Sequence, residues 1–392
     1  MTTAGVVERL FRQSAGPILA TLTRAFGADR LDLAEDCLAD AVELALRVWP
    51  VSGVPANPRG WLFRVARNRA LDVVRRERTL RTKLPLLAEA GEEARDDELA
   101  LMFLCCHPAL PRASQVALTL KIVGGLGVRE IATALLTKEP TVAQRLVRAK
   151  KWFRESGEAV EVPEVLESRL DSVLDVLYLL FNEGYQATTG ELAVRCELSA
   201  EAIRLTRLLT ADARTDLPRV RALLALELLQ ASRLPARDEL LPIDEQDRTR
   251  WDTALVREGA QVFETSCTGP ELSAFHVEAA IALCHTAVTP DRPRILALYD
   301  DLLVVRPSAV VRLNRAIALA LVDGPGAGIA ELERLAGDPA LAGHLPLPAA
   351  LGALHLRAGD PAAAARYFRR ALTLPCSGPQ RRFLARRLAA CG

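Results

Sequence analysis

Apolar side chains recur at intervals of three or four residues in the N-terminal part of the chain. Between residues 6 and 48, the positions that share this spacing are Leu10, Ile18, Leu22, Phe26, Leu38, Val42 and Leu46. Such spacing places them on one face of an α-helix, so we expect helices here. A turn-rich segment follows at residues 50–56. Asn57 and Pro58 then begin another predicted helix, as N-cap and first helical residue, which runs to about Arg78.

The pattern changes at residues 85–98, where acidic residues cluster and helical periodicity is weak. We interpret this segment as an acidic linker between two helical units. The second unit covers residues 99–157. Within it, residues 125–153 show two helical patterns around a short turn, which is typical of a helix-turn-helix motif. Ile131 would pack there against the helix that Pro140 begins.

The chain from residue 165 onward is again rich in helical patterns, and its final part pairs them. The pairs are residues 313–321 with 327–335, and residues 351–358 with 362–374. Their offset is close to the tetratricopeptide period of roughly 34 residues, although mixed helices with small residues at their crossings would look similar. Ala, Leu and Arg dominate, and aromatic residues are only 5% of the chain. We therefore predict an all-α fold: two small helical domains, the second a helix-turn-helix, followed by a helical, tetratricopeptide-like C-terminal domain.

Local charge is more informative than the net charge, which is only +1 for the whole chain. From Arg59 to Lys83, nine basic residues face only two acids. This excess suits binding to a phosphate backbone, and Trp61 and Phe63 are placed to stack on unpaired bases. A solvated arginine-rich helix with Trp61 in the core is the alternative. The segment just before is acidic, with Asp32, Glu35, Asp36, Asp40 and Glu43. An acidic helix beside a basic one suits a protein that binds a basic protein surface and DNA together.

These two segments resemble the extracytoplasmic-function sigma factors of the sigma-70 family. Residues 34–42 are similar to the family segment that binds the clamp helices of RNA polymerase, and residues 57–72 to the segment that melts and reads the −10 promoter element. The resemblance implies core-polymerase binding by Glu35, Asp36, Asp40 and Glu43. It implies −10 DNA contacts by Asn57, Arg59, Trp61, Arg64, Arg67, Asn68 and Arg75. Residues 50–56 lie where the family holds a flipped base.

The second helix of the helix-turn-helix offers an outer face suited to base edges and phosphates. Its residues are Thr141, Gln144, Arg145, Arg148 and Lys151. By itself the segment also fits an ordinary helical hairpin, and its turn lacks the glycine that many such motifs have. Its position after the first unit resembles the sigma region that binds the −35 element, which implies that role for these five residues. Ala143 stands where the family often has a polar or basic residue, which favours Gln144 and Arg148 as the base contacts.

An ordinary member of this family would end near residue 160, whereas this chain continues to residue 392. Residues 103–110 and 180–185 resemble a subgroup that carries a tetratricopeptide-like extension. The implied domains are sigma region 2 (1–84), an acidic linker (85–98), sigma region 4 (99–157), a helical extension (165–275) and tetratricopeptide-like repeats (276–392). Because repeat helices form concave binding surfaces, we expect the extension to dock a protein or peptide partner or to regulate activity.

Enzyme and metal motifs are not evident in the sequence. Cys105, Cys106 and His107 are adjacent, and adjacent cysteines chelate a tetrahedral ion poorly, so buried thiols are expected. No phosphate loop or nucleophile elbow is present. We predict no catalytic residue, no metal and no cofactor. Eight scattered cysteines and the lack of an apolar span of ~18 residues predict a cytoplasmic protein without a membrane partner.

The leading interpretation is a sigma factor that binds core RNA polymerase and promoter DNA and directs promoter-specific initiation. Two alternatives remain: a helix-turn-helix transcriptional regulator that acts without polymerase, and a repeat-scaffold adaptor for protein interactions. Adding core polymerase discriminates among these three functions. Only a sigma factor should direct specific initiation together with core polymerase and yet bind DNA weakly in its absence.

Overall fold

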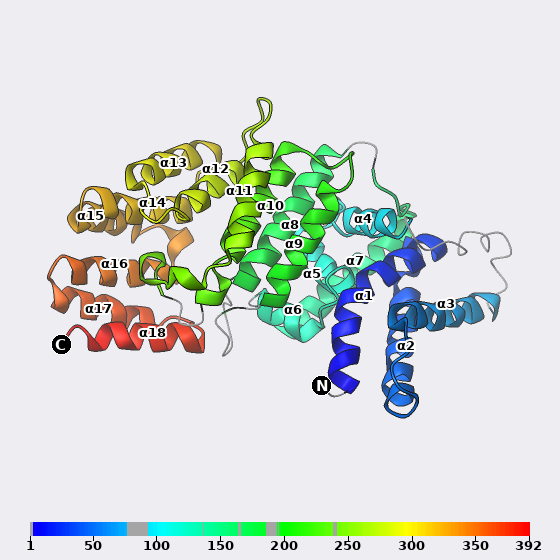
Figure 1. Ribbon diagram of the computed structural model, residues 1–392. Coiled ribbons are helices and arrows are strands. Elements are labelled where there is room, and N and C mark those ends of the chain that lie inside the picture. The colour runs from blue at the N-terminus through cyan, green and yellow to red at the C-terminus, as the bar shows by residue number, and fades with distance from the viewer. Residues whose placement is uncertain are drawn as a thin grey trace. The chain divides into compact units, whose positions relative to one another are not determined.

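A computed structural model describes residues 3–76, 93–135, 137–163, 166–185, 194, 196–237 and 241–392. Within these residues the chain forms helices and no strand (Figure 1). The predicted all-α fold class is therefore confirmed. The chain divides into two compact units, unit 1 (residues 1–177) and unit 2 (residues 178–392).

Unit 1 is built from α-helices, and both basic helices pack against other helices of this unit. Its α-helices are α1 (Thr3–Phe26), α2 (Leu31–Ser52), α3 (Pro58–Arg76), α4 (Glu93–Cys105), α5 (Arg112–Ile122), α6 (Val128–Ala134) and α7 (Glu139–Ser156). A 3₁₀ turn, η1 (Ala28–Arg30), connects α1 to α2, and α8 (Glu167–Tyr185) carries the division between the units. Helix α2 contacts α1 and α3, whereas α7 contacts α5, α6 and η1. The two basic helices therefore belong to one compact unit.

Helix α3 begins as the sequence predicts. The backbone N–H of Gly60 donates to Asn57 Oδ1 at 2.8 Å, so Asn57 is the N-cap. A Cβ at residue 60 would lie 2.7 Å from Asn57 Nδ2, and glycine therefore leaves room for the cap. The buried face of α3 is made of Leu62, Ala66, Ala70 and Val74. With this face buried, α3 exposes Arg59, Arg64, Arg69 and Arg75.

The acidic segment at residues 85–98 is helical at its C-terminal end. Residues 93–98 form the first turns of α4, and Asp97 and Glu98 are each only 4% exposed. Arg24 of α1 donates to the Asp97 carboxylate at 2.6 Å, which neutralises that charge inside unit 1. The linker interpretation is therefore wrong for residues 93–98, while residues 85–92 lie outside the described residues.

Unit 2 is a succession of helices in which each contacts the next. These helices are α9 (Cys196–Thr210), α10 (Pro218–Ala231), α11 (Thr253–Ser266), α12 (Ala274–Cys284), α13 (Arg292–Val305), α14 (Ala309–Val322), α15 (Pro325–Leu335), α16 (Pro346–Arg357), α17 (Pro361–Leu372) and α18 (Gly378–Ala389). Short 3₁₀ turns lie between some of them: η3 (Leu234–Ala236), η4 (Ile243–Glu245), η5 (Arg248–Arg250) and η6 (Pro339–Leu341). The two predicted helical pairs coincide with α14 and α15 and with α16 and α17.

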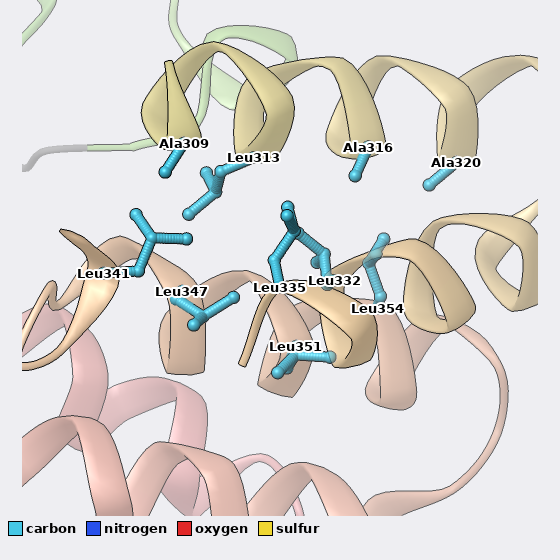
Figure 2. Packing of buried hydrophobic residues seen from close by; sticks show 10 residues of the cluster. All are labelled: Ala309, Leu313, Ala316, Ala320, Leu332, Leu335, Leu341, Leu347, Leu351 and Leu354. Carbon is cyan, nitrogen blue, oxygen red and sulfur yellow. The ribbon is translucent and has the colours of Figure 1, made fainter. Parts of the chain in front are cut away.

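The packing among α14, η6, α15 and α16 shows how these helices approach closely. Alanines on α14 face leucines of the neighbouring helices in Figure 2. The cluster contains Ala309, Leu313, Ala316, Ala320, Leu332, Leu335, Leu341, Leu347, Leu351 and Leu354. A Cβ added to Gly328 of α15 would lie 2.5 Å from the Cβ of Ala320. Small residues at the crossing therefore set the distance between α14 and α15.

Candidate nucleic-acid interface

Helix α3 presents cations that nothing in the described chain neutralises. Arg59, Arg64 and Arg75 are exposed, and none of them forms an ion pair with a described residue. Asn68 is exposed beside them. An exposed guanidinium without an internal partner remains available to a phosphate.

Three other residues implied as −10 contacts are tied to the fold. Asn57 uses its side-chain oxygen to cap α3. Trp61 is half-buried and meets the buried Trp49 of α2 edge-on, with ring centroids 5.3 Å apart. Arg67 is also half-buried. These side chains position α3, and the exposed arginines are the stronger candidates for DNA contact.

Helices α6 and α7 follow each other across a short turn and pack together, as a helix-turn-helix requires. Ile131 of α6 is buried, as is the inner face of α7, which comprises Val142, Leu146, Ala149 and Phe153. Pro140 occupies the first turn of α7, as predicted. The outer face of α7 exposes Gln144, Arg148 and Lys151, while Thr141 and Arg145 are half-buried. The five residues implied as −35 contacts therefore lie outside the buried face.

The four acidic residues implied in polymerase binding occupy different surroundings on α2. Asp36 is exposed. Asp40 accepts a hydrogen bond from Arg69 Nε of α3 at 3.0 Å, and Glu43 lies 3.9 Å from Arg47 on its own helix. The Glu35 side chain is only 14% exposed. Three of the four carboxylates are thus accessible, and Glu35 is committed to a contact inside unit 1.

That contact is an ion-pair cluster between α2 and α7, which we call the α2–α7 cluster. Lys150 Nζ lies 2.9 Å from Asp32 Oδ1 and also pairs with Glu35. Arg154 pairs with Asp32 at 2.5 Å, and Lys121 of α5 lies 3.8 Å from Glu35. Burial lowers the pKa of Lys150, but the carboxylates of Glu35 and Asp32 outweigh it, so the net pKa is raised. The cluster therefore joins the acidic helix to the C-terminal half of α7.

Sequence reasoning did not identify Lys150, Arg154 and Lys121 as partners of α2. The helical spacing of the buried residues of α7 does indicate two of these positions. Lys150 follows the buried Ala149, and Arg154 follows the buried Phe153, one turn further on. Both cations therefore lie at the border of the buried face, where a neighbouring helix can reach them.

The thiols near the end of α4 are buried. Cys105 and Cys106 have no exposed surface, and burial raises the pKa of Cys106 to about 11, so its thiol stays protonated at neutral pH. His107 Nε2 instead lies 3.3 Å from Glu158 Oε1, and its ring is tilted against that of Trp152 with centroids 4.5 Å apart. Within the part of the chain that the structure describes, no group of three or more His, Cys, Asp or Glu side chains is arranged to hold a metal ion. The described helices include none long and apolar enough to cross a membrane.

Comparisons with known proteins bear on both units. Residues 100–153 match the family described as sigma-70, region 4. Residues 169–267 match a family of unknown function, DUF6596. A protein of Rhizobium meliloti (strain 1021), named only as uncharacterized, is 35% identical over 413 residues, covering 99% of this chain and 96% of that protein. No solved structure matches.

Proposed function

The chain belongs to the sigma-70 family, as an extracytoplasmic-function-like sigma factor with a C-terminal extension, and on that premise we propose that it binds core RNA polymerase and directs initiation at particular promoters. The observation that carries the proposal is that the region 4 match, residues 100–153, includes the exposed face of α7. In this proposal α7 enters the major groove of the −35 element. The protein acts in the cytoplasm with polymerase and has no catalytic chemistry of its own.

Helices α2 and α3 supply the other two surfaces in this proposal. Arg59, Arg64, Asn68 and Arg75 contact the −10 DNA, because α3 holds them exposed. The exposed acids Asp36, Asp40 and Glu43 face a basic surface of polymerase. Glu35 joins them only if it leaves Lys150.

The α2–α7 cluster has a geometric consequence for promoter binding. The −10 and −35 elements are about 25 base pairs apart, or roughly 85 Å at ~3.4 Å per base pair. A compact domain of 177 residues is only ~40 Å across. Helices α3 and α7 therefore cannot reach both elements while the cluster holds. The 16 residues from 77 to 92 between α3 and α4 can span ~55 Å when extended, which is enough to let the modules separate.

Reconstitution with core polymerase tests the proposed function. We expect the full chain to co-purify with core polymerase and to confer initiation at defined start sites in run-off transcription of genomic fragments. Tight duplex binding without polymerase would support a helix-turn-helix regulator instead. Binding to neither polymerase nor DNA would support the adaptor.

A double substitution tests the polymerase surface. Asp36→Ala with Asp40→Ala removes two exposed carboxylates, and we expect weaker polymerase binding with unchanged helix content. Asp72→Ala, an exposed acid on α3, is the matched control. Polymerase affinity equal to that of the wild type in the double variant contradicts the assignment of α2.

Distance measurement tests the opening of unit 1. Fluorescent unnatural amino acids at positions 72 and 147 report on α3 and α7, and both positions are exposed. We expect a short distance in the free protein and a much longer one in the polymerase complex. An unchanged distance in a complex that initiates transcription would show that the cluster does not need to open.

For unit 2 we propose docking of a protein or peptide partner, or regulation of activity. The support is the succession of contacting helices, in which α16 and α17 begin about 36 residues after α14 and α15, near the tetratricopeptide period. Truncation after Tyr185 tests this, because it keeps α8 and the 2.5 Å contact of Arg112 with Asp175. We expect altered promoter output in cells. Unchanged output in cells and in vitro would leave unit 2 without this role.

A further inference from the structure

Unit 2 contains a cavity of about 380 Å³, lined by side chains from α8, α10, α12, α13 and α14. This volume lies within the usual range for small-molecule sites, roughly 300–1,000 Å³. Its polar lining includes Tyr178, Arg233, Glu278, His285, Tyr299 and Arg306. All of these residues belong to unit 2.

The one carboxylate that lines the cavity is already neutralised. Arg306 donates to Glu278 Oε1 at 3.1 Å, and the Tyr178 hydroxyl donates to Glu278 Oε2 at 2.8 Å. The Arg306 guanidinium also lies over the rings of Tyr178 and Phe275, at 5.6 and 5.1 Å from their centroids. This network fixes Arg306 and leaves Glu278 with little attraction for a further cation.

Arg233, in contrast, has no anionic partner among the described residues. Its Nε donates to the neutral Gln246 at 3.2 Å, and its guanidinium lies near the rings of Tyr185 and Trp251, at 5.8 and 5.5 Å. No carboxylate of a described residue pairs with it. Two further arginines stand nearby, and burial together with their charge lowers the pKa of Arg233 despite the opposing effect of Tyr185.

Those neighbours, Arg237 and Arg248, likewise pair with no carboxylate of a described residue. Arg237 donates to the backbone oxygen of Tyr185 at 3.3 Å, and Arg248 donates to the carbonyl of Ala287 at 2.7 Å. A half-buried cation without a counter-ion among its described neighbours is costly, so the position of Arg233 at the wall of a cavity suits an external anion.

The other residues that line the cavity indicate which kind of ligand body would fit beside the charged group. Ile281, Leu302, Val310 and Val311 contribute apolar surface. Burial, followed by the charge of Arg233, lowers the pKa of His285 to about 4, so its ring is neutral at pH 7. The charges at the cavity are two cations, Arg233 and Arg306, and one anion, Glu278. This balance suits a single negative charge better than a phosphate dianion.

We propose that this cavity binds a small monocarboxylate with an apolar or aromatic body, whose carboxylate pairs with Arg233. A bidentate guanidinium–carboxylate contact would supply orientation, and the apolar wall would hold the body. The site makes unit 2 a small-molecule receptor, independently of what unit 1 binds.

Titration calorimetry on the full chain tests the proposal with three probes. Phenylacetate carries both the charge and the body, phenylacetamide is its neutral isostere, and inorganic phosphate carries charge alone. We expect phenylacetate to saturate one site per chain, and each of the other two to bind at least ten-fold more weakly. Because this comparison uses wild-type protein, it does not depend on how any variant folds. Equal affinity for the acid and the amide, or no saturable binding of the acid, overturns the proposal.

Two variants locate the site. Arg233→Gln should weaken phenylacetate binding at least ten-fold, and Val310→Trp should do the same by filling the cavity from α14 without changing charge. Arg257→Gln, at an exposed position on α11, is the control and should bind as the wild type does. Unchanged affinity in both cavity variants would place the carboxylate elsewhere and overturn the assignment.

Discussion

Helices α3 and α7 are both basic, yet they hold their cations in different surroundings. On α3, Arg64 and Arg75 are exposed and have no ion pair with any described residue. On α7, Lys150 lies between Asp32 and Glu35, with only 18% of its side chain exposed. Net charge along a helix therefore does not tell which cations are available to DNA.

The position of a side chain relative to the buried face of its helix explains why some cations are paired and others are exposed. Lys150 lies beside the buried Ala149, where the acidic start of α2 reaches it. Gln144 and Arg148 lie on the outer face of α7, away from α2. Helix α7 thus has one border that contacts α2 and one outer face that stays exposed, the face proposed to bind DNA. Three predictions test this division.

The largest effect is expected from loss of the Lys150 ammonium. Lys150→Ala leaves Glu35 half-buried, with Lys121, at 3.8 Å, as its remaining cation among the described residues. We expect the unfolding free energy of unit 1 to fall by about 3 kcal/mol, the low end for buried pairs, because both side chains retain some contact with water. Urea unfolding followed by tryptophan emission measures it, since Trp49, Trp61 and Trp152 all lie in unit 1.

Lys151→Ala is the matched control, one residue further along α7. Its side chain is 65% exposed and, among the described residues, pairs with Glu155 at 3.7 Å. Such surface pairs contribute at most ~0.5 kcal/mol, so its urea midpoint should barely move. Equal midpoints for the two variants would mean that the α2–α7 cluster does not stabilise unit 1.

Local sequence signals predicted much of unit 1. Asn57 caps α3, and Ile131, Val142 and Leu146 are buried in the helix-turn-helix. These features depend on residues a few positions apart, and short-range patterns record them directly. The pairing of Glu35 with Lys150 depends instead on how α2 and α7 pack, which no local pattern contains.

Helix boundaries were predicted less well, and the reasons are physical. Helix α2 continues through Pro50 to Ser52, although a proline cannot donate a backbone N–H to the carbonyl four residues earlier. Gly53, at φ 80°, then ends it by donating to the carbonyl of Trp49 at 3.0 Å. Residues 93–98 are helical, and Asp97 pairs with Arg24 of α1, a contact distant in sequence that their acidic composition does not reveal.

A smaller effect is expected from Arg148→Ala, which removes a cation from the outer face. If Arg148 reads a base edge, discrimination at the −35 element should fall by ~1–3 kcal/mol while stability stays unchanged. Transcription from promoters with substituted −35 positions measures it. Val147→Ala, at a 61% exposed neighbour, is the control and should keep full discrimination. An equal loss at every promoter, whatever its −35 sequence, would assign Arg148 to the phosphate backbone.

The smallest effect is expected from substitution of one exposed arginine of α3. It should be detected mainly as a change in the salt dependence of DNA affinity. Arg75→Gln should reduce the slope of log affinity against log salt by about 0.7–0.9, the values for one phosphate contact on single-stranded and duplex DNA, with polymerase present. Arg69→Gln is the decisive comparison on the same helix, because Arg69 already pairs with Asp40. Its slope should stay that of the wild type, since an arginine held by a carboxylate releases no counter-ion from DNA. If both variants lower the slope equally, pairing within the protein does not decide which cations of α3 meet the phosphates, and the distinction between free and paired cations fails for this helix.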